Sequence, residues 1–143
     1  MFSMANEAVL IVETEHPVNF TCANGTGIEK GTLCKIADLM TASASLAAGD
    51  VLAGIAGAEK IASDGTTKVP IFMGGIFKMT ASGTVPVGRA VSSASISAWP
   101  NYVCAAGVTV SGSAILGHAL ETAGAGETFL VRVNVGAGGN QIS

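Results

Sequence analysis

The chain has 143 residues, a formal net charge of −3 and 12% charged residues, about half of the usual fraction of roughly 25%. This length suits one domain with its own core, and an acidic balance without any basic run excludes nucleic acid as the main partner. No apolar run approaches the roughly 18 residues that a membrane-spanning helix needs, so we expect no membrane partner. A surface with so few charges tends to associate, and we therefore expect the protein to assemble with other subunits.

The N-terminal third of the chain predicts short strands joined by turns. Val9–Val12 is apolar at every position, which predicts a strand covered on both faces. Val18–Cys22 alternates apolar and polar side chains, as a half-buried strand does, and Thr32–Ile36 follows two glycine-containing turns. Asp38–Gly49 has irregular apolar spacing and several Ser and Thr residues, so we expect a loop with at most one helical turn there.

The stretch 51–80 is the predicted centre of the fold. Two apolar runs, Val51–Ile55 and Val69–Met73, flank a polar turn that contains Asp64-Gly65, and a third run, Ile76–Thr80, follows two glycines. Asp-Gly is a strong turn signal, so the stretch predicts a β-meander with this turn at an exposed tip. The side chains expected to build its core are those of Ile55, Ile71, Met73 and Phe77.

The C-terminal half continues the same pattern. Thr128–Val135 is the clearest strand, because its alternation places the apolar side chains at 129, 131, 133 and 135 on one face. Further strands are predicted at Arg89–Val91, Asn101–Ala106, Val108–Val110 and Ala114–Leu120. No stretch forms a convincing amphipathic helix. The sequence therefore predicts an all-β fold, a small antiparallel β-sandwich or barrel-like domain with short strands, Gly-rich turns and little helix.

The expected organisation is simple. Residues 1–8 form an N-terminal arm, residues 9–135 a single β domain, and residues 136–143 a flexible, Gly-rich C-terminal tail. The N-terminus lacks the basic and long apolar regions of a signal peptide, which predicts synthesis and use in a cytoplasm, or export only as part of a larger assembly.

Residues that usually carry catalysis or bind metals are scarce. Gly25–Lys30 begins like a dinucleotide-binding glycine pattern, but Lys30 replaces the third glycine and a strand follows, which favours a structural turn. The two histidines, His16 and His118, lack metal-ligand spacing, and no GxSxG nucleophile motif occurs in the sequence. We expect no catalytic residues, no cofactor and no metal, and hence no enzyme. Cys22, Cys34 and Cys104 are expected to be reduced apolar side chains, with one disulfide as the alternative.

The candidate contact residues lie near the N-terminus and around the single tryptophan. The segment 4–15 is terminal, apolar at Val9, Leu10, Ile11 and Val12, and acidic at Glu13 and Glu15. Trp99 precedes Pro100 and lies near Tyr102 in a Ser-rich loop. We expect Trp99 and Tyr102 to anchor a subunit interface, and a stacking platform for a glycan is the alternative.

Seven segments, taken together and in order, carry a family resemblance. They are Met4–Ala8, Ile28–Leu33, Asp50–Ala56, Glu59-Lys60, Gly75–Phe77, Ile115–Glu121 and Gly126–Thr128. With these segments the chain resembles the capsid cement, or head decoration, proteins of tailed phages over residues 4–136. The three cysteines are not part of that pattern and leave open an intersubunit disulfide.

The resemblance implies a structural role without catalytic residues. It implies a small β-rich protein, usually a trimer, that binds the outer surface of the assembled major capsid protein shell and stabilises it. Such a protein would be made in the host cytoplasm and located on the capsid exterior. The alternative function is that of a non-catalytic surface β-domain, similar to an adhesin, that binds glycans or another ligand.

Overall fold

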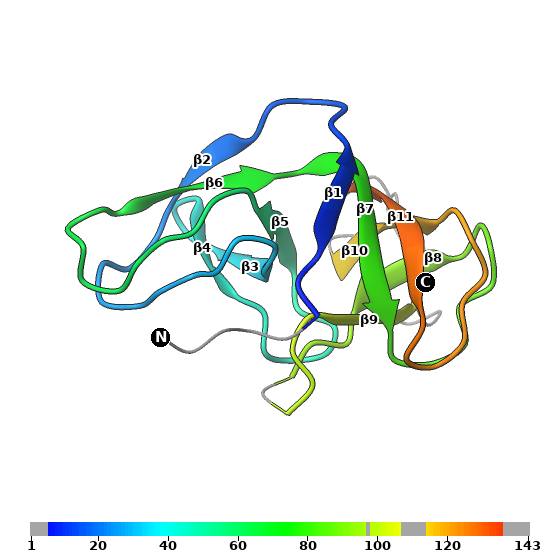
Figure 1. The fold of residues 1–143 in the computed structure, drawn as a ribbon. Coiled ribbons are helices and arrows are strands. Elements are labelled where there is room, and N and C mark those ends of the chain that lie inside the picture. The colour runs from blue at the N-terminus through cyan, green and yellow to red at the C-terminus, as the bar shows by residue number, and fades with distance from the viewer. Residues whose placement is uncertain (1–5, 97, 107–113, 136–143) are drawn as a thin grey trace.

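The computed structural model describes residues 6–96, 98–106 and 114–135. These residues form eleven β-strands and no α-helix, so the predicted all-β, barrel-like fold is confirmed. No helix capable of crossing a membrane occurs in this part of the chain. The strands divide between two sheets that lie side by side (Figure 1).

The first sheet is a closed five-stranded barrel. Its strands follow the order β2-β4-β3-β5-β6, and a short parallel pairing between β2 and β4 closes it. Inward-facing apolar side chains fill the barrel, among them Phe20, Val69 and Ile71. The strands are β2 (Val18–Thr21), β3 (Leu33–Ala37), β4 (Thr41–Ala44), β5 (Leu52–Ala56) and β6 (Lys68–Phe72).

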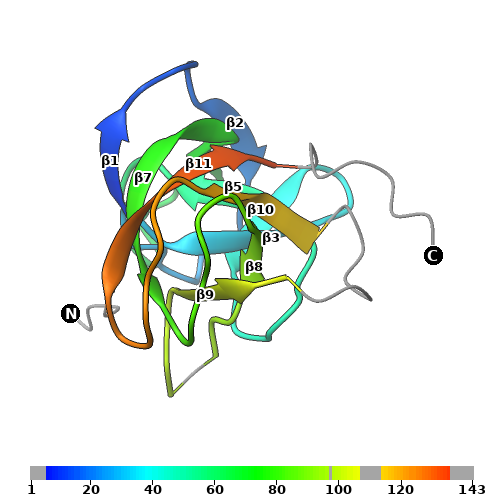
Figure 2. The same cartoon turned by 90° about the vertical axis from the view of Figure 1, so that its right-hand side faces the viewer.

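The second sheet has six strands in the order β1-β7-β11-β10-β8-β9. An additional parallel pairing between β7 and β9 curls it into a second barrel-like unit, with β1 outside β7 at its margin (Figure 2). The strands are β1 (Val9–Val12), β7 (Gly74–Ala81), β8 (Ala90–Ser93), β9 (Tyr102–Ala105), β10 (Ile115–Ala119) and β11 (Thr128–Asn134).

One hydrophobic cluster spans the two units, beside a separate cluster inside the first barrel. The chain passes from β6 into β7 with only Met73 between them, as the long green ribbon in Figure 1 shows. Phe72 from the first barrel meets Phe77 from the second sheet edge to face, with ring centroids 5.7 Å apart. Leu33 and Ile55 belong to the same buried cluster as the core of the second sheet. Apolar burial therefore continues across the junction.

Several sequence-based expectations agree with the structure. In β11 Phe129, Val131 and Val133 are buried while Arg132 and Asn134 are exposed, as the alternation predicts. The predicted core residues Ile55, Ile71 and Phe77 are buried, Met73 is half-buried against the first barrel, and the Asp64-Gly65 turn is exposed.

One element was predicted wrongly. The segment 38–49, expected to be a loop, contains β4, which pairs antiparallel with β3 from Cys34–Ala44 to Ala37–Thr41. Short polar side chains form a strand here because barrel closure supplies the partners: the Thr21 amide donates to the Met40 carbonyl at 2.8 Å. The predicted strand 108–110, the tail 136–143 and residues 1–5 of the arm lie outside the described residues.

Glycine is required where β5 approaches β6. Gly54 has φ = +146°, and a Cβ at this position would collide with the carbonyl oxygen of Phe72. Only glycine fits such a close backbone approach.

Candidate functional site

Strand β1 presents apolar side chains to solvent. Val9, Ile11 and Val12 are each about half exposed, at 54%, 50% and 46%, and only Leu10 packs against the core. The prediction that this strand is covered on both faces is therefore wrong for the single chain. Among the described strands β1 pairs only with β7, so its other edge is unpaired. An apolar edge strand with unpaired backbone groups is a favourable place for another protein to bind.

The acidic residues after β1 belong to a turn. The strand ends at Val12, so Glu13 and Glu15 do not continue it as strand residues. Glu13 lies 3.3 Å from Nδ1 of the exposed His16, and the Glu15 side chain packs against Gly74 at the start of β7. These carboxylates therefore lie directly beside the apolar edge of β1.

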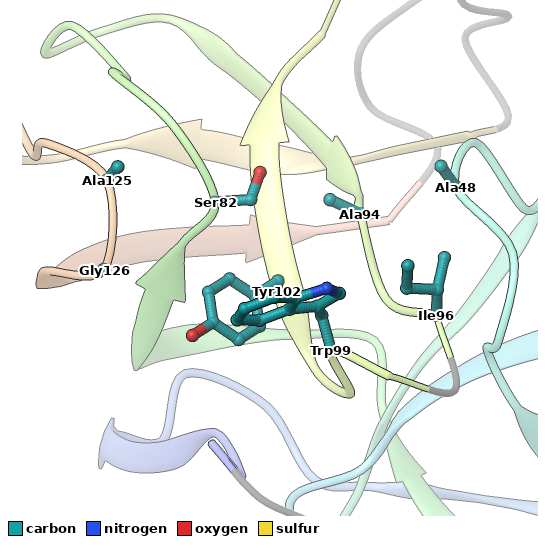
Figure 3. A pocket seen from close by; sticks show the side chains of 8 residues that line it. All are labelled: Ala48, Ser82, Ala94, Ile96, Trp99, Tyr102, Ala125 and Gly126. Atoms are coloured by element: carbon teal, nitrogen blue, oxygen red, sulfur yellow. The ribbon is translucent and has the colours of Figure 1, made fainter.

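Trp99 and Tyr102 form one wall of an open groove. Their rings are perpendicular with centroids 5.7 Å apart, and Trp99 is 58% exposed. The groove has a volume of about 600 Å³ and a mostly apolar lining. Figure 3 shows the side chains that line it. The residues that line it are Ala48, Ser82, Ala94, Ile96, Trp99, Tyr102, Ala125 and Gly126. The predicted pair Trp99 and Tyr102 thus does come together at the surface.

A buried polar network holds the tryptophan loop in place. Ser45 Oγ lies 2.9 Å from Ser93 Oγ, and Ser95 Oγ donates to the Ser45 carbonyl at 2.6 Å. Asn101 Oδ1 accepts from the Leu33 amide at 3.0 Å, which links the loop to the first barrel. Ser45, Ser93, Ser95 and Asn101 are all fully buried. Satisfied buried networks of this kind favour one conformation, so the groove is preorganised.

Sequence reasoning missed this network. The serines looked like members of a featureless Ser-rich loop, and Asn101 like the first residue of a strand. Asn101 has φ = +63°, a conformation that Asn tolerates better than most residues. The Ser-x-Ser pattern before Trp99 was the only local signal, and its partners lie about fifty residues away in the sequence.

Most ionisable side chains in the part of the chain that the structure describes are exposed at the surface. No group of three or more His, Cys, Asp or Glu side chains there could hold a metal ion. His118 is exposed on β10, opposite Arg132. All three cysteines are free thiols. Burial raises the pKa of the Cys34 thiol to about 12, so this group stays protonated at neutral pH.

Comparison with known proteins identifies the family. A family model described as phage cement protein matches residues 12–135, most of the chain. The chain belongs to the phage cement protein family. It is therefore a structural component of a phage virion, and the family assignment made from the sequence is confirmed. No curated protein matches the chain.

A solved structure has a similar fold. The N base of head fiber gp8.5 in bacteriophage phi29 matches with a TM-score of 0.52 and 16% sequence identity, over 82% of this chain and 93% of that one. This likeness concerns the fold alone. The family model covers the first barrel, strands β7–β11 and the Trp99 groove, and it begins at Val12, the last residue of β1.

Proposed function

We propose that this protein is a non-catalytic cement subunit that binds the outer surface of the assembled major capsid protein shell and stabilises the shell. It does so as a homotrimer on the capsid exterior, after synthesis in the host cytoplasm, and it needs neither cofactor nor nucleic acid. The observation that carries the proposal is the exposed apolar edge of β1 in a member of the cement family.

The β1 edge supports capsid binding for two reasons. A subunit that adds to a finished shell must bury apolar surface on contact, and Val9, Ile11 and Val12 offer such surface without internal cover. Unpaired strand edges also accept a partner strand through backbone hydrogen bonds. Glu13 and Glu15 beside this edge would favour a partner segment that carries Lys or Arg.

The continuous core supports one rigid subunit. The buried cluster that includes Leu33, Phe72 and Phe77 spans both barrels, and the Asn101–Leu33 hydrogen bond joins them again. We therefore propose that residues 9–135 move as a single domain, which lets a load on one barrel pass to the other.

Co-sedimentation with undecorated shells of the cognate phage tests the proposal. Wild-type protein should pellet with the shells and raise the temperature at which they release DNA or break. Ile11→Lys should abolish co-sedimentation, because a charge would replace an apolar side chain at the contact. Val87→Lys is the matched control, since Val87 is 61% exposed in a turn away from β1. Wild-type protein that never pellets would refute the function, and equal binding by Ile11→Lys would refute the role of β1.

A second candidate function rests on the Trp99 groove. An exposed tryptophan on a rigid loop can stack against the apolar face of a sugar ring, and Tyr102 and Ser82 supply hydroxyl groups near it. Glycan-array binding that is lost in Trp99→Ala would favour this candidate. Absence of glycan binding, together with weaker trimers or weaker shell binding in Trp99→Ala, would favour an interface role for the groove.

A further inference from the structure

Asn24 and Gly25 form an exposed turn that places a side-chain amide beside an unhindered backbone nitrogen. Asn24 is the only asparagine of the sequence that is followed by glycine. Both residues are exposed, and they lie between β2 and the antiparallel bridge that joins Ile28 to Lys60. The side-chain carbon of an asparagine and the backbone nitrogen of the next residue can close a five-membered ring. A following glycine favours this closure, because it has no side chain to obstruct the approach.

The Gly25 amide is available as a nucleophile. Among the described residues, no acceptor receives a hydrogen bond from the Gly25 N–H. A Cβ built on Gly25 would meet no atom within 4 Å, so the turn is open to solvent at this residue. Solvent can therefore take the proton from this nitrogen without first breaking a hydrogen bond.

Two donors stabilise the anion that the Gly25 nitrogen forms when it loses its proton. Lys60 Nζ donates to the Asn24 carbonyl at 2.8 Å, and the Ser63 amide donates to the same oxygen at 2.6 Å. This carbonyl belongs to the peptide bond between Asn24 and Gly25, so it shares the negative charge of the deprotonated nitrogen. A buried ammonium beside the oxygen stabilises that charge. The Gly25 N–H is therefore more acidic than the amide of an ordinary exposed turn.

A third donor holds the group that would be attacked. The Gly65 amide donates to Asn24 Oδ1 at 2.8 Å. Attack on Asn24 Cγ turns this oxygen into an oxyanion, and a backbone N–H that already points at it lowers the energy of the tetrahedral intermediate. Both carbonyl oxygens of the ring that would form, the main-chain oxygen and Oδ1 of Asn24, thus have donors before the reaction begins.

We propose that Asn24 deamidates spontaneously through a succinimide and that the folded turn promotes this reaction. The Gly25 nitrogen gives its proton to solvent and forms a bond to Asn24 Cγ. The bond from Cγ to the side-chain nitrogen then breaks, and ammonia leaves with a proton from water. A water molecule opens the ring: attack at Cγ gives aspartate, and attack at the main-chain carbonyl gives isoaspartate. Because the Lys60 ammonium polarises the main-chain carbonyl, isoaspartate is the favoured product.

The modification changes both the charge and the backbone of the turn. A carboxylate at position 24 would join Asp64 beside Lys60, so that two negative charges share a single buried cation. Isoaspartate also adds a carbon atom to the main chain between residues 24 and 25, which displaces the carbonyl that accepts from Lys60 and Ser63. The contact between the turns at residues 24–27 and 61–66 should therefore weaken as the protein ages. This inference does not depend on capsid binding.

Peptide mapping by mass spectrometry, after incubation in mildly alkaline buffer, measures the conversion without any variant. Asn24 should convert about tenfold faster in the folded full chain than in the same chain unfolded in urea, because only the folded turn supplies the donors. Asn19 and Asn134 are exposed internal references that precede bulky residues and should convert far more slowly. Gly25→Ala should suppress the conversion. This variant keeps the fold, because φ of Gly25 lies outside the range from +20° to +160° and the added Cβ meets no atom within 4 Å.

Lys60→Met tests the cationic donor, and Thr66→Val is its matched control. Lys60→Met should lower the rate and the share of isoaspartate towards the values of the unfolded chain. Thr66→Val removes a hydrogen bond to Asp64 in the same turn but leaves the contact from Lys60 to Asn24, so it should convert like wild type. Circular dichroism checks that each variant is folded. Slower conversion of Asn24 in the folded than in the unfolded wild type, or an unchanged rate and product ratio in folded Lys60→Met, would overturn the proposal.

Discussion

Lys60 makes the most demanding polar contacts in the first barrel, and its replacement should destabilise the fold. Its side chain is 1% exposed, and Nζ donates to the carbonyls of Asn24 at 2.8 Å and Ile61 at 2.6 Å and to Asp64 Oδ1 at 2.8 Å. These bonds tie the turn at residues 24–27 to the turn at residues 61–66. Lys60→Met keeps the length of the aliphatic stem and removes all three donors.

The expected loss follows from what each acceptor retains. The Asn24 carbonyl still accepts from the Ser63 amide, and the partly exposed Asp64 still accepts from Thr66. The carbonyl of Ile61 loses the donor that Lys60 supplies, and a hydrogen bond from a charged donor contributes about 1.5–3 kcal/mol. The bond to the Asn24 carbonyl adds about 1 kcal/mol after release of the buried ammonium is counted. We therefore expect a loss of about 3 kcal/mol in the free energy of unfolding.

Urea and thermal unfolding at fixed protein concentration measure this loss. A change of about 3 kcal/mol should lower the Tm by roughly 6–12 °C in a chain of this size. Lys68→Met is the control: Lys68 is exposed, its contact to Thr21 Oγ1 is 3.3 Å long, and its loss should stay within about 0.5 kcal/mol. If Lys60→Met were as stable as the control, the ammonium would not be buried as described.

Three further predictions concern single residues. Hydrogen bonds from Lys60 and Thr66 hold the pKa of Asp64 below its ordinary value of 3.8. The ionised carboxylate therefore stabilises the fold fully above pH 3.8, and this contribution is lost as the pH falls below that value. Asp64→Asn should remove this pH dependence, so that the free energy of unfolding falls less steeply in acid. Gly54→Ala should leave the protein unfolded or cost more than about 3 kcal/mol, whereas Gly65→Ala, which meets no atom within 4 Å, should cost only about 1–2 kcal/mol for its positive φ; equal losses would contradict the close approach. A thiol reagent should label Cys104, which is partly exposed, before Cys34, and Cys34 should react only on unfolding.

The strands were predictable wherever apolar side chains follow a local period. The alternation in β11 fixes both the strand and its buried face, because every second residue points to the same side. The turn at Asp64-Gly65 was also predictable from a local signal. The Asp-Gly pair favours a turn, and Gly65 takes the positive φ of +88° that glycine accepts readily. Even so, the pattern of apolar residues did not reveal that the strands divide between two sheets, because pairing partners lie far apart in the sequence.

The features that sequence reasoning missed are long-range polar contacts. Lys60 lies between Glu59 and Ile61 with no local signal of burial, yet its side chain is buried and one of its acceptors, the Asn24 carbonyl, lies 36 residues away. Asn101 reaches the Leu33 amide across 68 residues. β4 was missed because its short polar side chains suit a loop as well as a strand, and only barrel closure decides between them. No periodicity in a single segment can report contacts of this kind.

The placement of the two missed networks bears on function. Neither surrounds a reactive group; each fastens a turn or a loop to the first barrel, and the network around Ser95 and Asn101 fixes the base of the exposed Trp99 loop. Buried polar groups add less stability than apolar packing of the same volume, but they favour one geometry over its alternatives. A protein that reinforces a shell benefits from a single fixed geometry, because a contact surface that deforms under load would transmit little of that load to the rest of the protein. If this reasoning holds, Asn101→Ala should weaken binding to the shell more than its loss of stability alone explains, and the single tryptophan at position 99 provides a fluorescence signal by which the loosened loop can be followed.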